Sequence, residues 1–221
     1  MDYQWDFGVM LTSLPVLLRG VGVMAQLWAG CFVAGLAAGL VVCLMRLSSH
    51  RLLAAIGTAW VELFRNVPAL IQLIWAFYAF PVLIGAQLTP FAAAFLGIGL
   101  NTSAYCAEIY RAGIQSIERG QWEGAQALGM SRHLVLRRII LPQVLHRMIP
   151  AFTNRGIELA KVTSLASVLS VHELMYQGRL LSSTYYRPLE ILSTVAIAYF
   201  VVIYPFSFAS RRLERRLDSR R

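Results

Sequence analysis

Long runs of uncharged residues constrain the fold of this chain more than any other feature. Three of them stand out: 20–45, 66–107 and 191–210. A helix that crosses a bilayer needs about 20 mostly apolar residues. The middle run is too long for one crossing, and Pro81, Gly85 and Pro90 divide it into two. A more polar segment, 148–171, adds one more crossing. The sequence therefore predicts an all-α membrane protein with about five transmembrane helices.

Composition supports the same class. The chain has 221 residues, which suits a single transmembrane domain over 1–221. Hydrophobic residues make up 57% of it, a share too high for an ordinary soluble domain. The formal net charge of +9 would suit a nucleic-acid partner. Most arginines, however, lie near a predicted membrane edge, where anionic membrane lipid accounts for them. A nucleic-acid partner is therefore not expected.

The arginines also orient the helices, because loops on the cytoplasmic side of a membrane are enriched in Lys and Arg. Cations follow the first predicted helix, at Arg46 and Arg51, and recur within 112–146. The basic tail 211–221 holds six arginines, whereas 84–90 holds none. We therefore expect the N-terminus outside, with the loop 112–146 and the basic tail in the cytoplasm.

The first predicted crossing begins after Arg19. Residues 1–18 contain no cation and lack the basic start of a signal peptide. They are expected to form an amphipathic segment on the outer face. Within the crossing, small residues recur every four positions, which permits close helix approach. They could pack within the subunit or against a partner subunit: Cys31, Gly35, Gly39 and Cys43.

The cytoplasmic loop has a helix–turn–helix pattern. Residues 118–129 are predicted to form a short polar helix that Gly129 ends, since glycine readily takes the left-handed conformation found after helices. Ser131 is placed to cap the next helix. Pro142 cannot donate a backbone hydrogen bond, so it is expected to bend or end that helix. Such a stiff protrusion can transmit force from a docked protein.

The loop reads Glu123-Gly-Ala-Gln-Ala-Leu-Gly129 and then Ile139-Ile-Leu-Pro142, with further matching residues over 107–117 and 161–167. This pattern resembles the coupling loop of ABC-importer permeases that transport polar amino acids. The resemblance implies a type I importer transmembrane domain, multi-pass in the bacterial inner (cytoplasmic) membrane. It places the ATPase-coupling positions on these residues: Glu123, Gly124, Ala125, Gly129 and Pro142. Gly124 departs from the usual alanine, which should loosen the helix by about 1 kcal/mol.

The resemblance also implies partners: two ATP-binding subunits carrying ATP and Mg²⁺, a second permease subunit that is identical or homologous, and a periplasmic substrate-binding protein. The chain itself has no Gly-x-x-x-x-Gly-Lys-Ser/Thr phosphate loop and no His-Glu-x-x-His pattern. Its cysteines lack Cys-x-x-Cys spacing and are expected to be packing residues. No catalytic residue, metal site or cofactor of its own is therefore predicted, and the chain is not expected to be an enzyme.

Polar residues inside predicted crossings are candidate substrate contacts, because ionisable groups at membrane depth are costly. The only lysine, Lys161, lies near Arg155 and Glu158. By resemblance to this subfamily, an amino acid substrate could contact Asn101, Tyr105, Lys161, Thr163 and Ser164. Three acid–base pairs at i,i+3 spacing are interpreted as structural locks, with a substrate role as the alternative: Glu62–Arg65, Glu108–Arg111 and Glu158–Lys161.

The predicted substrate is glutamate or aspartate. Many relatives carry an acid or an amide where this chain has Val162. The retained cation at Lys161 would pair with an acidic amino acid, and Arg155 is a second candidate partner. Residues 1–7 and 186–190 also resemble the glutamate/aspartate branch. Glutamine or a cationic amino acid remains an alternative substrate.

Other classes of function are also considered. An ion-coupled secondary amino acid carrier would need mid-membrane carboxylates or broken helices, and 66–107 offers no acid. An intramembrane enzyme would need a nucleophile–base or metal pair, and no residues have that spacing. A purely structural subunit would tolerate the loss of Glu123 and Lys161.

Overall fold

The computed structural model describes residues 5, 6 and 8–218. Parts of the predicted outer segment (1–4 and 7) and of the basic tail (219–221) lie outside these described residues. Within the described part, all regular structure is helical. The α-helices are α1 (Gly8–Arg46), α2 (Arg51–Asn66), α3 (Ala69–Ile74), α4 (Phe80–Ile84), α5 (Pro90–Gln115), α6 (Arg119–Ala127), α7 (Arg132–Val135), α8 (Leu141–Val162), α9 (Leu174–Tyr185) and α10 (Pro188–Asp218). Two π-helices and one 3₁₀-helix join them: η1 (Trp75–Ala79), η2 (Leu136–Ile140) and η3 (Thr163–Leu169).

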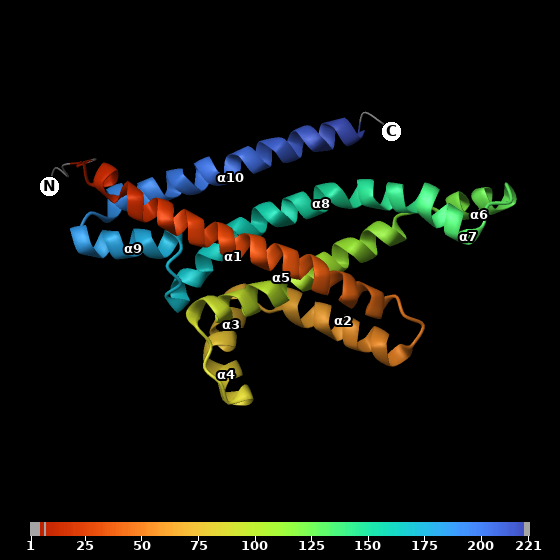
Figure 1. The fold of residues 1–221 in the computed structure, drawn as a ribbon, viewed down its shortest axis with the longest axis horizontal. Helices are drawn as coiled ribbons and strands as arrows, with labels where there is room; N and C mark the ends of the chain where they lie inside the picture. Colours follow the sequence, from red (N-terminus) through yellow and green to blue (C-terminus); the bar gives the residue numbers. More distant parts are fainter. Residues whose placement is uncertain (1–4, 7, 219–221) are drawn as a thin grey trace.

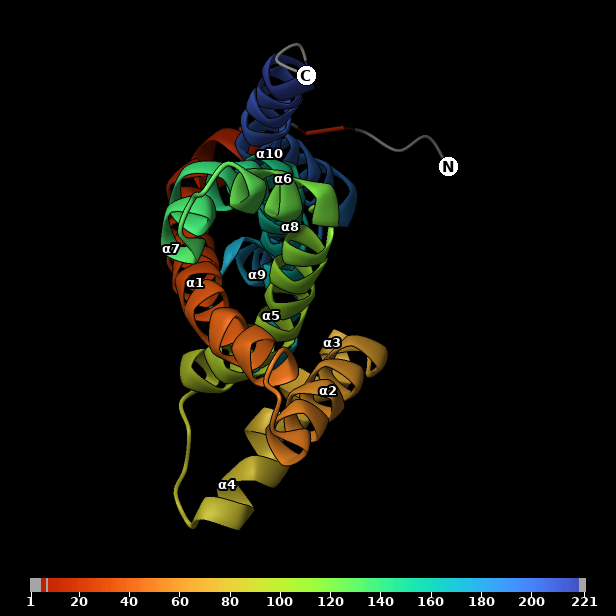
Figure 2. The same ribbon diagram turned by 90° about the vertical axis from the view of Figure 1, so that its right-hand side faces the viewer.

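The long helices α1, α5, α8 and α10 run along the length of the molecule (Figure 1). Helices α6 and α7 lie at one end, beyond the neighbouring ends of α5 and α8, while α9 lies at the opposite end beside the start of α1. Helices α3 and α4 project to one side, as both views show (Figures 1 and 2). The loop predicted to be cytoplasmic therefore forms one tip of the subunit.

Helices α1 and α5 pack closely because the small residues of α1 face α5. A Cβ atom at Gly35 would lie 2.5 Å from Thr102 Cγ2, and one at Gly39 would lie 2.6 Å from Cys106 Cβ. Neither distance leaves room for a larger side chain. The small-residue stripe is therefore a packing surface within the subunit, which decides between the two alternatives that the sequence left open.

Helix α1 begins at Gly8, so residues 8–18 continue without a break into the segment of the predicted first crossing, whose start after Arg19 stays a prediction. Pro15 lies inside this helix without ending it. Leu17 is buried with Leu174 and Leu181 of α9, which anchors the first turns of α1 to the rest of the bundle. Residues 8–18 are therefore part of α1 and not a separate segment.

The apolar run 66–107 breaks at the predicted place. Helix α4 ends at Gly85, whose φ of +66° is left-handed, and α5 begins at Pro90. The Thr89 hydroxyl oxygen caps α5 by accepting a hydrogen bond from Ala92 N at 3.2 Å. An additional bend of 107° separates α2 from the α3–α4 unit. It coincides with Pro68, which precedes α3.

Among the described residues, α1 and α10 are the two helices long and apolar enough to cross a membrane, and the bent pair of α2 with α3–α4 would be a third. Helices α5 and α8 are long enough, at 26 and 22 residues, but their polar side chains lower their hydropathy. The count of five crossings stays a prediction. Several of these polar side chains are buried inside the bundle: Asn101, Thr102, Ser103 and Arg155.

Candidate functional site

The coupling segment, residues 119–140, has the turn that the sequence predicted. Helix α6 ends before Gly129, whose φ is +78°. The Met130 amide then donates back to the Ala125 carbonyl at 3.2 Å. Ser131 Oγ accepts a hydrogen bond from Leu134 N at 3.4 Å and caps α7. The predicted roles of Gly129 as helix terminator and Ser131 as helix cap are both confirmed.

Apolar contacts anchor the coupling segment to the ends of α5 and α8. Ala125 of α6 is buried with residues of the next elements, and the cluster reaches back to the end of α5 and forward into α8: Ile117, Val135, Ile140, Val144 and Met148. Arg147 of α8 donates a hydrogen bond to the Ser116 carbonyl. A movement of the coupling segment would therefore be transmitted to both helices.

The opposite face of α6 is exposed. Glu123, Gly124 and Gln126 all lie on it, and Leu128 at the tip is 83% exposed. A Cβ atom at Gly124 would meet no atom within 4 Å. Of the residues predicted to serve ATPase coupling, Glu123 and Gly124 thus face outward, whereas Ala125 faces inward and holds the helix in place.

Pro142 occupies the first turn of α8 and does not end a helix. Pro142 has no amide proton, so the helical path passes this position without that hydrogen bond. The preceding residues widen into the π-helix η2, so α7, η2 and α8 form one continuous helical path. Of the two predicted outcomes at Pro142, a bend or an end, the helix does not end, and a π-helix stands directly before the proline.

An ion cluster joins α1, α2 and α5. Arg46 donates to Glu108 Oε2 at 2.6 Å, Arg111 pairs with the same carboxylate, and Arg65 approaches it at 3.9 Å. The predicted Glu108–Arg111 pair is confirmed. The predicted Glu62–Arg65 pair is wrong, because Glu62 accepts a hydrogen bond from Asn66 at 2.8 Å and Arg65 turns toward Glu108.

The polar cluster of Asn101, Thr102, Tyr105 and Arg155 lies inside the bundle, where α5 meets α8. Arg155 is 5% exposed and donates to Asn101 Oδ1 at 2.8 Å and to Thr102 Oγ1 at 3.2 Å. Its guanidinium also lies 4.0 Å from the centre of the Tyr105 ring. Asn101 Nδ2 donates to the Phe64 carbonyl at 2.8 Å. The cluster thus ties α2, α5 and α8 together.

Arg155 was predicted only as a second possible partner of an acidic substrate, whereas in the structure it organises this cluster. The available signal was an arginine in a crossing, which is rare unless it has partners. Those partners are 54 and 53 residues away in sequence, so spacing could not identify them. Glu158 is 3.6 Å from Arg155. The predicted Glu158–Lys161 pair is therefore replaced by a pair with the preceding cation.

Lys161 and Ser164 lie apart from this polar cluster. They line a cavity of about 700 Å³ between the end of α8, α9 and α10. Lys161 is exposed, and Tyr199 lies on the facing wall of this Lys161 cavity. Thr163 is fully buried and donates to the Ala160 carbonyl at 2.8 Å. The structure therefore does not bring the five predicted substrate contacts together, since Asn101 and Tyr105 hold Arg155 and Thr163 faces the core.

One buried acid beside the Lys161 cavity was missed by the sequence analysis. Glu173 is fully buried and caps α9 by accepting hydrogen bonds from Met175 N at 2.9 Å and Tyr176 N at 2.8 Å. It also accepts a hydrogen bond from Tyr199 OH at 2.9 Å. This contact fixes the Tyr199 ring at the cavity wall. A Glu at the start of a helical segment was the available signal, since a carboxylate there can satisfy free amides.

Comparison with known proteins is consistent with this geometry. The family described as "Binding-protein-dependent transport system inner membrane component" matches residues 27–220. The glutamine transport system permease protein GlnP of Escherichia coli (strain K12) is 36% identical, over 97% of this chain and 98% of its own length. The arginine transport system permease protein ArtQ of Bacillus subtilis (strain 168) is 30% identical, over 97% and 98%. The solved structure of an amino acid ABC transporter with histidines has a TM-score of 0.90 at 31% identity, over 97% of this chain and 100% of that one.

Proposed function

Because the chain belongs to the family of binding-protein-dependent transport system inner membrane components, we propose that its coupling segment docks an ATPase subunit and that its Lys161 cavity receives a polar amino acid. The chain is a permease subunit of an ABC importer of amino acids in the bacterial inner membrane. It is not an enzyme, since ATP hydrolysis lies in separate subunits. The ion-coupled secondary carrier is set aside because the chain belongs to this family of ABC-importer permeases.

The observation that carries the docking proposal is the two-sided construction of α6. Its inner face is held by the apolar cluster around Ala125, while Glu123 and Leu128 on the other side are exposed. A helix fixed on one face and free on the other suits a partner that grips it and moves it as a unit. Two ATPase subunits would bind two such segments, one on this chain and one on a second permease subunit. A periplasmic binding protein would deliver substrate to the outer side.

The Lys161 cavity supports an acidic substrate. Its lining includes two cations, Lys161 and Arg211, and the described lining residues include no carboxylate. A glutamate or aspartate side chain could pair with a cation there, whereas an arginine side chain would be repelled. Glutamine is the second candidate, because the E. coli relative is a glutamine permease and an amide can accept a hydrogen bond from Lys161.

The test uses the importer reconstituted in vesicles with its ATPase subunits and binding protein. Glutamate or aspartate should stimulate ATP hydrolysis and uptake more than glutamine, and arginine should not stimulate either. Lys161→Met should lower uptake about tenfold, as expected for the loss of about 1.4 kcal/mol of binding, whereas Lys161→Arg should retain most of it. Unchanged uptake by Lys161→Met would remove Lys161 from the pathway. Stimulation by arginine alone would overturn the substrate class.

A further inference from the structure

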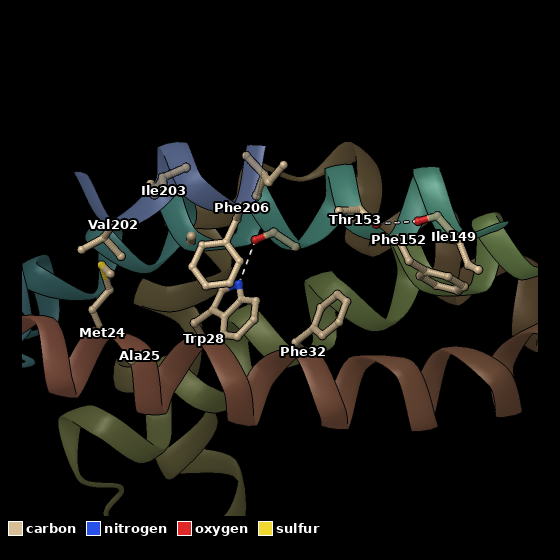
Figure 3. A pocket seen from close by; sticks show the side chains of 13 residues that line it. Met24, Ala25, Trp28, Phe32, Ile149, Phe152, Thr153, Val202, Ile203 and Phe206 are labelled. Carbon is tan, nitrogen blue, oxygen red and sulfur yellow. Dashed lines mark hydrogen bonds between the residues drawn. The ribbon is translucent and has the colours of Figure 1, made fainter. Parts of the chain in front are cut away.

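A second cavity, of about 450 Å³, lies between α1, α8 and α10 (Figure 3). Met24, Trp28 and Phe32 of α1 form one wall, and Phe206 of α10 reaches in over Trp28 (Figure 3). The Trp28 and Phe206 ring centres are 5.8 Å apart. Apart from Thr153, every side chain that lines this α1–α10 cavity is apolar or a glycine. Neither Lys161 nor Arg155 lines it, and it shares only Ile203 with the lining of the Lys161 cavity.

The two polar groups of its wall already have partners. Trp28 Nε1 donates to the Gly156 carbonyl at 2.8 Å, and Thr153 Oγ1 donates to the Ile149 carbonyl at 2.8 Å. An amino acid placed here would lose its hydrogen bonds to water without replacing them, which is strongly unfavourable. The chemistry of the wall therefore fits a hydrocarbon and not the transported substrate.

The position of the cavity fits a membrane lipid. Helices α1 and α10, which enclose it, are the described helices long and apolar enough to cross a bilayer. Along α10, the lining residue Val202 is followed ten positions later by Arg212. At 1.5 Å per residue this separation is about 15 Å, which is half of a hydrocarbon core of about 30 Å. An acyl chain whose headgroup is at Arg212 can thus reach the cavity.

The charge at that end of α10 fits an anionic headgroup. Arg211 and Arg212 are exposed. Their guanidinium groups lie 5.7 Å from the Tyr204 ring centre and 4.5 Å from the Phe208 ring centre. These contacts hold both cations along the helix beside the predicted cytoplasmic surface, where anionic lipids attract basic residues. We propose that the α1–α10 cavity binds one acyl chain of an anionic phospholipid of the cytoplasmic leaflet, with its phosphate at Arg212.

Photolabelling of the purified complete importer in lipid nanodiscs tests the chain-binding part. The probe is phosphatidylglycerol with a diazirine near the end of one chain, and labelled peptides are identified by mass spectrometry. Label should concentrate on peptides that contain Trp28 and Phe206. Ala25 lines the cavity, whereas Ala29 is exposed on the same helix outside it. Ala25→Phe should therefore lower labelling at least fivefold, and Ala29→Phe should not change it. Equal labelling in both variants, or label spread evenly over all lipid-facing helices, would overturn the proposal.

A second measurement tests the headgroup. Unlabelled phosphatidylglycerol should compete at least fivefold better than phosphatidylcholine with the same chains. Arg212→Gln should abolish this preference, whereas Arg19→Gln on α1 should preserve it. Equal competition by the two lipids would refute the anionic headgroup. Efficient disulfide crosslinking from a cysteine at position 25 to a second permease subunit would assign the cavity to a subunit interface and would also overturn the proposal.

Discussion

In the polar cluster, charged and amide side chains turn inward and bind one another, whereas in the coupling segment the polar side chains face outward and apolar residues provide the anchoring. Arg155 is 5% exposed against Asn101 and Thr102. Glu123 is exposed, while Ala125, two residues later, is buried. The contrast shows that a polar residue in this chain can serve either packing or docking. Substitutions should separate the two uses, with loss of stability in the first region and loss of coupling in the second.

The largest expected effect on stability is that of Asn101→Ala. It removes an acceptor of Arg155 and the donor to the Phe64 carbonyl, so a buried cation loses a partner. The expected cost is about 3 kcal/mol, measured as a lower thermal midpoint of the purified complex. Adding Arg155→Met should recover part of the loss, because the unpaired cation is then gone. A double variant as unstable as the sum of both single variants would show that the two residues act independently.

Two smaller effects on stability, opposite in sign to each other, are expected within the coupling segment. Gly129 has a φ of +78°, so Gly129→Ala should cost about 1–2 kcal/mol. Gly124 lies within α6 with open space where a Cβ would be, so Gly124→Ala should stabilise the helix by about 1 kcal/mol. Hydrogen exchange of residues 119–127 in the purified complex is the measurement. Slower exchange in the Gly129→Ala variant would contradict the assigned turn.

The smallest effect on stability is expected for Glu123→Gln. This exposed side chain is not buried against the rest of the subunit, so the free energy of unfolding should change by less than about 0.5 kcal/mol. Substrate-stimulated ATP hydrolysis should nevertheless fall if this face docks an ATPase subunit. The matched control is Gln143→Ala in the first turn of α8. The Gln143 side chain donates a hydrogen bond to Gln121 Oε1 of α6 at 3.3 Å. Full stimulation in the Glu123→Gln variant would place docking on other residues.

Features fixed by short-range chemistry could be predicted from the sequence. The turn at Gly129, the cap at Ser131 and the break between Gly85 and Pro90 all depend on neighbouring residues, and all three were predicted. Features fixed by distant contacts could not. Glu158 has a cation three positions away on either side, Arg155 and Lys161, and only the packing of α8 against α5 decides that Arg155 is its partner. The π-helix η2 was not predicted as such, because Pro142, which follows it, indicates only that the helix bends or ends there.

The substrate contacts illustrate the same limit. Asn101, Tyr105 and Lys161 all appeared as polar residues in apolar surroundings. Their side chains nevertheless point to two different places, because Arg155 occupies the interior between α5 and α8 and leaves Lys161 at the edge. Because Arg155 is buried, Asn101 and Tyr105 contact its guanidinium and do not line the Lys161 cavity. No pattern in the sequence indicates whether Arg155 or Lys161 is the buried cation.

The Glu108 carboxylate has a mechanical consequence for the whole subunit. Arginines from α1, α2 and α5 converge on it. These three helices therefore cannot separate around Glu108 without breaking an ion contact. They are expected to pivot as one lever during each transport cycle. The relative sliding that opens and closes a passage would then fall to α8 and α10, which both line the Lys161 cavity and the α1–α10 cavity.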